Sequence, residues 1–200
     1  MNKVDMIFKN AIVLTVDNEY KIFEPGAVAV TDNIITAVGE EKDILKAYEG
    51  KEVVDCGGKV LMPGLINTHT HLPMAILRGI MDDLRLDEWL NDYIFPTEGN
   101  FVNSKTVKLG TELACAELIK SGCTTVLDMY YFPDVIADVL IKAGMRGICD
   151  NTIMCFPGVD QVPVDDKFSN AEKFTEKYKN HRLIYSAIGP HAPYTNSEET

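Results

Sequence analysis

The sequence lacks long apolar runs and low-complexity tracts. No segment approaches the ~18 consecutive apolar residues that predict a membrane-spanning helix. The first residues, Met1–Met6, include a lysine but neither a long apolar stretch nor a small-residue cleavage site, so we expect no signal peptide. These absences favour a globular protein of the cytoplasm, with no membrane partner.

The sequence also lacks any C-x-x-C pair, although it contains 5 cysteines: Cys56, Cys115, Cys123, Cys149 and Cys155. Their number is odd, and each lies in or beside an apolar or strand-like stretch. This pattern favours reduced, mostly buried thiols over a disulfide framework, which again predicts a cytoplasmic location.

Positive charge is scarce. The chain has 19 lysines and arginines against 30 aspartates and glutamates, a formal net charge of −11. Such a balance argues against nucleic acid or an anionic membrane as a partner, because both require a positively charged surface. A small neutral or cationic ligand is more compatible, and the composition leaves a homo-oligomer open.

Residues 1–58 are predicted to form a small β domain. Strands are predicted over Val4–Val16, Ala27–Thr31, Ile34–Val38 and Glu52–Asp55. Asp32-Asn33 is a turn pair suited to a hairpin between the second and third of these strands. Glu40–Tyr48 is a candidate short helix.

From residue 59 onward, strands alternate with helices. Strands are predicted over Val60–Thr68 (interrupted by Pro63-Gly64), Thr124–Met129, Arg146–Ile153 and Leu183–Gly189, and helices over Val107–Ile119 (N-cap Ser104), Pro133–Ala143 and Asn170–Lys179. This alternation predicts an α/β fold with a parallel sheet. Residues 59–200 would supply about half of a TIM-type (β/α)8 barrel, which needs about 250 residues.

The chain ends just after the fourth predicted strand. Half a barrel leaves a strand edge unpaired and an apolar face uncovered, so we expect the chain to be part of a longer protein. A doubly wound open sheet is the alternative architecture. The G-x-G-x-x-G fingerprint of dinucleotide-binding members of that class is absent.

The segment Asn67–His71 is the main candidate for chemistry. His69 and His71 are two residues apart at the end of an apolar strand, so their side chains leave the strand on the same side. Imidazole nitrogens bind zinc at about 2.0–2.1 Å and also suit iron or nickel. Barrel enzymes place functional residues at the carboxyl ends of strands, as here. The alternative is a pair of exposed loop histidines.

The segment Val60–His71 resembles the first-strand signature of the amidohydrolase superfamily. Three further segments, His71–Gly79, Glu88–Glu98 and Gly189–Tyr194, are similar to methylthioadenosine/S-adenosylhomocysteine deaminases and their chlorohydrolase relatives. The resemblance covers essentially the whole chain. It implies the first four β/α units of a metal-dependent hydrolase barrel, preceded by a small β-sandwich domain.

The resemblance also implies roles for individual residues. His69 and His71 would bind one divalent metal ion, expected to be Zn²⁺ with Fe²⁺ or Ni²⁺ as alternatives; no lysine follows the fourth strand to bridge a second metal. Glu98 would bind the substrate's ribose, although the residues alone suggest a surface glutamate. Trp89 would pack on the substrate or lie in the core. His191 would contact substrate, with metal ligation as the alternative.

The implied reaction is hydrolytic deamination of an adenosine-type nucleoside by metal-bound hydroxide. The resemblance places the remaining metal ligands and the acid/base glutamate on later strands, beyond Thr200. We therefore expect no catalytic acid/base residue within residues 1–200, and a fragment of this extent should be inactive, because a catalytic zinc normally takes three protein ligands.

Other functions remain open. A chlorohydrolase or a free-base deaminase, acting on guanine or cytosine, could use the same scaffold, and a degenerate barrel could be a non-catalytic module. One departure bears on the substrate. Some relatives carry an arginine near the end of the third strand, where this sequence places Asn151. Asp128, which ends the second strand, is expected to be structural.

Overall fold

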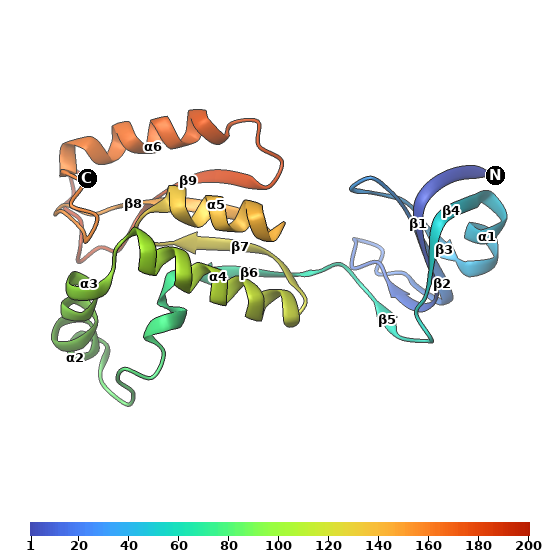
Figure 1. The fold of residues 1–200 in the computed structure, drawn as a ribbon, viewed down its shortest axis with the longest axis horizontal. Helices are drawn as coiled ribbons and strands as arrows, with labels where there is room; N and C mark the ends of the chain where they lie inside the picture. The colour runs from blue at the N-terminus through green and yellow to red at the C-terminus, as the bar shows by residue number, and fades with distance from the viewer. The chain divides into compact units, whose positions relative to one another are not determined.

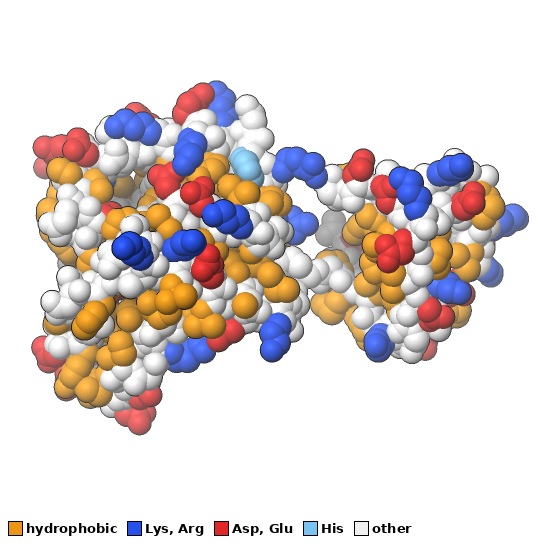
Figure 2. Space-filling view, viewed as in Figure 1, with side chains coloured by type: hydrophobic (Ala, Val, Ile, Leu, Met, Phe, Trp, Pro, Cys, Tyr) orange, Lys and Arg blue, Asp and Glu red, His pale blue; other side chains and the backbone are white.

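The computed structural model describes all of residues 1–200, which form two compact units, Met1–Pro63 and Gly64–Thr200 (Figure 1). None of the helices combines the length and the apolarity that crossing a lipid bilayer requires. Acidic and basic side chains are interspersed on the face of Gly64–Thr200 that Figure 2 shows, without a large patch of one sign.

Unit 1 is a five-stranded sheet with one short helix. Its elements are β1 (Asn2–Leu14), β2 (Ile22–Thr31), β3 (Ile34–Glu40), α1 (Glu41–Ala47), β4 (Tyr48–Asp55) and β5 (Val60–Leu61). The strand order is β3-β2-β1-β4, and β5 also pairs with β1. The predicted hairpin around Asp32-Asn33 is confirmed, since β2 and β3 pair antiparallel on either side of it. Residues 1–63 contain a single sheet and no second sheet layer.

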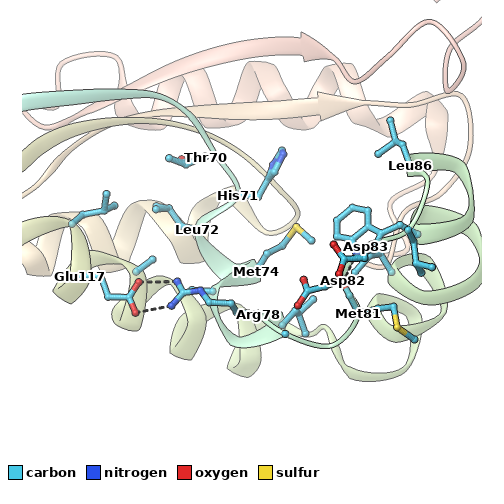
Figure 3. A pocket seen from close by; sticks show the side chains of 18 of the residues that line it. Thr70, His71, Leu72, Met74, Arg78, Met81, Asp82, Asp83, Leu86 and Glu117 are labelled. Carbon is cyan, nitrogen blue, oxygen red and sulfur yellow. Dashed lines mark hydrogen bonds and ion pairs between the residues drawn. The ribbon is translucent and has the colours of Figure 1, made fainter. Parts of the chain in front are cut away.

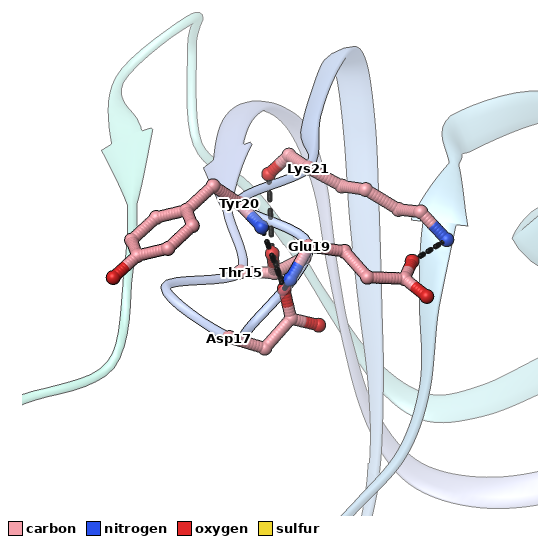
Figure 4. A network of polar contacts seen from close by, with 5 residues as sticks. All are labelled: Thr15, Asp17, Glu19, Tyr20 and Lys21. Carbon is pink, nitrogen blue, oxygen red and sulfur yellow. Dashed lines mark hydrogen bonds and ion pairs between the residues drawn. The ribbon is translucent and has the colours of Figure 1, made fainter.

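The turn between β1 and β2 is organised by one carboxylate. Asp17 accepts hydrogen bonds from the Thr15 hydroxyl at 2.8 Å and from the backbone amides of Glu19 and Tyr20 at 3.1 and 3.0 Å (Figure 4). Lys21 pairs with Glu19 across the same turn. A side chain that satisfies neighbouring amides is a standard way to stabilise a turn outside regular structure.

The structure divides the chain later than the sequence analysis did. Val60 and Leu61 pair in parallel with Ile12 and Val13 of β1, so they belong to unit 1 and not to the start of the barrel-like part. Proline has no backbone N–H to donate to a sheet, and Pro63 lies between β5 and the next strand. The single predicted strand Val60–Thr68 is therefore two strands.

Unit 2 is a four-stranded parallel sheet with helices between its strands. Its elements are β6 (Leu65–Thr70), η1 (Leu72–Leu77), α2 (Leu86–Glu88), η2 (Trp89–Ile94), α3 (Phe95–Phe101), α4 (Ser104–Lys120), β7 (Cys123–Met129), α5 (Pro133–Ala143), β8 (Arg146–Ile153), α6 (Val164–Tyr178) and β9 (Ile184–Pro190). The strands follow one another in the order β6-β7-β8-β9, and each pair is parallel. A doubly wound sheet reverses its strand order, and this sheet does not.

The main core lies between this sheet and its helices. Val126 of β7, Cys149 of β8 and Ile184 of β9 are buried in one cluster with side chains of α4, α5 and α6. The neighbouring positions along the strands point to the opposite face. There Tyr185 is 57% exposed, so the face of the sheet away from the helices is open to solvent and partly apolar.

The region between β6 and β7 differs most from the predictions. Leu86–Phe101 is a continuous helical run in which a π-helical turn, Trp89–Ile94, joins α2 to α3. Asn103, not Ser104, caps α4: its Oδ1 accepts from the amides of Lys105 and Thr106, and Thr106 Oγ1 accepts from the Asn103 amide. This reciprocal capping box satisfies amides that have no partner inside the helix.

Candidate active site

The two candidate metal ligands lie together at the carboxyl end of β6. His69 is in the strand and His71 follows its last residue. A register shift between Asn67 and Thr70 interrupts the pairing with β7. The imidazole rings are 5.3 Å apart between centroids and nearly perpendicular, at 86°. The rings therefore leave the chain on the same side, at a separation that allows one cation to contact both.

The ring of His71 is oriented by a backbone contact. Its Nδ1 lies 2.6 Å from the carbonyl oxygen of Met129, at the end of β7. A carbonyl can only accept, so Nδ1 carries a proton, and in the neutral ring the lone pair is on Nε2. A backbone carbonyl on the far nitrogen is the usual arrangement behind a metal-binding histidine.

A small cavity beside His71 is lined by four of the five candidate residues. Its volume is about 110 Å³, and its lining includes His71, Trp89, Glu98 and His191. These residues come from segments after β6 and after β9. Met129, Tyr130 and Tyr131 at the end of β7, and Thr152 and Met154 at the end of β8, also line the cavity. His69 is exposed and is not among the lining residues.

Glu98 is a buried residue of this cavity, with 4% of its surface exposed. The Tyr130 hydroxyl donates to its Oε1 at 2.6 Å. Burial raises the pKa of the Glu98 carboxyl, while the Tyr130 bond and the nearby His71 act in the opposite direction. The reading of Glu98 as a surface residue does not fit this position. A buried carboxylate with one oxygen that is not bonded to Tyr130 can accept hydrogen bonds from the hydroxyl groups of a ligand.

His191 lies across the cavity, just after β9. Its Nδ1 is 3.0 Å from the Thr195 hydroxyl, which itself donates to the Ala192 carbonyl. Nδ1 is therefore the donor, and Nε2 is free to accept. Burial lowers the pKa of His191, and the positive charge of a protonated His71 would lower it further. A neutral imidazole suits a polar contact with a ligand.

Trp89 is partly buried and fixed by its own hydrogen bond. Its Nε1 donates to the Met81 carbonyl at 3.2 Å, which leaves the ring face as the surface that lines the cavity. It lies in the π-helical turn, a feature that is frequent at functional sites.

A larger cavity of about 880 Å³ adjoins the same region (Figure 3). Arg78 donates two hydrogen bonds to the Glu117 carboxylate of α4 at one end, and Asp82 and Asp83 lie toward the other. It shares His71 and Trp89 with the smaller cavity but contains neither Glu98 nor His191. The smaller cavity is therefore the better candidate for the chemistry, despite its size.

Tyr130 and the contacts made by the end of β7 were not predicted from the sequence. The signal was present, because Tyr130-Tyr131 directly follows a predicted strand at its carboxyl end. Asn151 is not in the cavity with Glu98. Its amide donates to Ser186 Oγ and to the Ala187 carbonyl, so its polar group is directed to β9.

The residues present fit part of a metal site. His69 and His71 offer two imidazoles on one side, with Nε2 of His71 free, but no group of three or more His, Cys, Asp or Glu side chains is placed to hold an ion. Two ligands are fewer than the three of a catalytic zinc site.

Residues 60–200 match the sequence profile of the Amidohydrolase family. The chain belongs to this family. The match includes both histidines, the cavity and all four strands of the parallel sheet, which confirms the family predicted from Val60–His71. In an amidohydrolase, the carboxyl ends of parallel barrel strands carry the active site, and this is the edge at which the candidate residues meet.

Individual amidohydrolases resemble the chain over nearly its whole length. It is 42% identical to the 5-methylthioadenosine/S-adenosylhomocysteine deaminase of Thermodesulfovibrio yellowstonii, covering 97% of this chain and 45% of that protein. It is 41% identical to the 5'-deoxyadenosine deaminase of Methanocaldococcus jannaschii, covering 86% and 40%. The chain thus spans less than half the length of these curated relatives.

A solved structure shows the same fold. An adenosine deaminase from Xanthomonas campestris with bound zinc superimposes with a TM-score of 0.91 at 36% identity, covering 97% of this chain and 44% of that one. Like the two sequence relatives, it is longer than the present chain.

Proposed function

We propose that the protein is a metal-dependent hydrolytic deaminase of an adenosine-type nucleoside, of the 5'-methylthioadenosine or S-adenosylhomocysteine class. Residues 64–200 supply the first four β/α units of its (β/α)8 barrel, and residues 1–63 supply part of a small β domain beside it. The convergence of His71, Trp89, Glu98 and His191 on one cavity carries this proposal.

His69 and His71 hold one divalent ion, for which zinc is the first candidate because the Xanthomonas campestris deaminase contains it. When bound, the ion supplies Lewis acidity and lowers the pKa of a water molecule toward neutrality. The remaining ligands and the acid/base glutamate belong to later strands, in the part of the relatives that this chain does not cover.

The other residues orient the substrate. Glu98, buried beside Tyr130, accepts hydrogen bonds from the vicinal ribose hydroxyls, since an ionised carboxylate offers two acceptor oxygens. The Trp89 ring packs on the face of the purine. His191, with Nε2 free, makes a polar contact with the substrate.

Substrate screening on the full-length protein tests the function. Release of ammonia is measured with adenosine, 5'-methylthioadenosine, S-adenosylhomocysteine and 5'-deoxyadenosine, and with guanine, cytosine and a chlorotriazine. Ammonia from the nucleosides alone is expected. Turnover of only a free base or only the chlorotriazine contradicts the nucleoside assignment, and no turnover of any compound favours a non-catalytic module.

Metal analysis tests the two ligands separately. We expect His69→Ala and His71→Ala to lose bound metal and activity. His181→Ala is the matched control, because His181 lines neither cavity and its Nδ1 accepts hydrogen bonds from the Leu183 and Ile184 amides. Equal metal content in wild type and in His71→Ala would show that the ligand assignment is wrong.

A further inference from the structure

The carboxyl end of β7 contacts the backbone on both sides of His71. Asp128 Oδ1 accepts a hydrogen bond from the Leu72 amide at 2.5 Å. The same oxygen lies 3.0 Å from the Thr70 hydroxyl, which also lies 2.8 Å from the Leu127 carbonyl. One carboxylate on a neighbouring strand therefore reaches the residue before His71 and the residue after it.

The contact to the imidazole itself comes from the next residue of the same strand. Met129 presents its carbonyl to Nδ1 of His71 at 2.6 Å. Asp128 thus fixes the backbone at His71 while Met129 fixes the ring. Groups that hydrogen-bond to the far side of a metal-binding imidazole orient its ring and set which nitrogen is free.

The burial of the Asp128 carboxyl group is energetically unfavourable. It is 1% exposed, and its second oxygen, Oδ2, has no hydrogen-bond partner. It lies on the helix-covered face of the sheet, since its register partner on β8 is the buried core residue Cys149. Burying a carboxyl group there costs free energy that an apolar residue would not. The hydrogen bonds that Asp128 makes to the residues on either side of His71 offset this cost.

We infer that Asp128 is a positioning residue for His71: by holding the backbone from Thr70 to Leu72, it places the imidazole against the Met129 carbonyl and leaves Nε2 available as a metal ligand. Asp128 does not line the small cavity, so we expect it to act through His71. The inference rests on the proposed role of His71 as a metal ligand.

The test compares zinc affinity with stability in the full-length protein. Zinc dissociation constants are measured by competition with a chromophoric chelator, and melting temperatures are measured on the metal-free protein. Asp128→Ala should weaken zinc binding by about 10- to 100-fold, the usual range when a residue that supports a metal ligand is removed. Asp128→Asn keeps an acceptor oxygen for Leu72 and Thr70, so it should recover most of the affinity.

Ile136→Val is the control for general loss of stability, because Ile136 is 1% exposed in the same core and lines neither cavity. It should lower the melting temperature and leave zinc affinity unchanged. In the metal-free protein, the Nδ1 proton of His71 should exchange slowly by NMR in wild type and in Ile136→Val, and quickly in Asp128→Ala.

The outcomes separate this inference from the proposed function. Wild-type zinc affinity and slow proton exchange in Asp128→Ala would overturn the positioning role. Full zinc affinity in His71→Ala would overturn the ligand role of His71, whatever Asp128 does. If Asp128→Ala does not fold, Thr70→Val is the deciding variant. It removes the hydroxyl that lies 3.0 Å from Asp128 Oδ1 and should weaken zinc binding, and unchanged affinity counts against the inference.

Discussion

The hydrogen bond between Tyr130 and Glu98 gives a prediction whose size depends on pH. Tyr130→Phe keeps the ring and removes only the hydroxyl, which lies 2.6 Å from a carboxyl oxygen that is buried. Such a bond contributes about 0.5–1.5 kcal/mol when the acceptor is neutral and about 1.5–3 kcal/mol when it is charged. The loss of unfolding free energy should therefore be about 1 kcal/mol where Glu98 is protonated and about 2–3 kcal/mol where it is ionised.

The direction of the pH dependence follows from the pKa of Glu98. Burial raises this pKa above the ordinary value of 4.5, and the Tyr130 bond lowers it in part. A carboxyl group with a raised pKa in the folded state loses stability as the pH rises through that value. Removing the tyrosine hydroxyl raises the pKa of Glu98 further. Between the two pH values of the assay, about pH 5 and pH 8, the variant should therefore lose more unfolding free energy than wild type does.

Urea unfolding of wild type and variant at both pH values measures this difference. Tyr131→Phe is the matched control, because its hydroxyl makes no hydrogen bond to another side chain and its effect should not change with pH. A loss for Tyr130→Phe that is the same at both pH values, or larger at pH 5, would refute the reasoning. With the proposed nucleoside substrates, the same variant should raise KM more than it lowers kcat.

Three further changes test the packing around the site. Asp150→Asn should raise the unfolding free energy at pH 8 by roughly 3 kcal/mol but not at pH 4. The reason is that burial raises the pKa of Asp150 from 3.8 to about 6, and neither of its carboxyl oxygens has a hydrogen-bond partner. An unchanged unfolding free energy at pH 8 would show that the carboxylate has a partner in the native protein. Gly110→Ala should destabilise the protein by about 1–3 kcal/mol in thermal unfolding. The added methyl group would lie 2.2 Å from the Pro73 carbonyl oxygen, a backbone atom that cannot move away by a change of rotamer. A stabilised variant would contradict this. Asn103→Ala should cost about 1 kcal/mol in the same assay through loss of the α4 capping box, and Asn103→Ser, which keeps an acceptor, should recover most of it.

The sequence predicts the regular parts of unit 2 well. The helix Pro133–Ala143 and the strand Arg146–Ile153 have the predicted bounds, because a proline begins the helix and Gly144, with a φ of 71°, ends it. The helical run Leu86–Phe101 was not predicted. It contains Pro96 and Gly99, which are poor helix formers, and its π-helical turn breaks the 3.6-residue period on which such predictions depend.

The candidate site was predictable only where it follows from strand geometry. The proximity of His69 and His71 follows from the alternation of side chains along β6, and the approach of His191 to the same edge follows from the parallel sheet. The pairing of Glu98 with Tyr130 joins residues 32 positions apart, and no local pattern encodes it. It depends on how the Leu86–Phe101 run folds over the end of β7.

The unbroken order β6-β7-β8-β9 has a consequence for how such a protein can change. Because the strands are parallel, the segment that follows each strand starts at the same edge of the sheet, where the carboxyl ends lie. Each of these segments can therefore change in length or sequence while the sheet is preserved. Variants with a new substrate preference should accordingly be sought in segments 78–98 and 154–163, whereas selection that retains the proposed hydrolysis should leave His69 and His71, at the end of β6, unchanged.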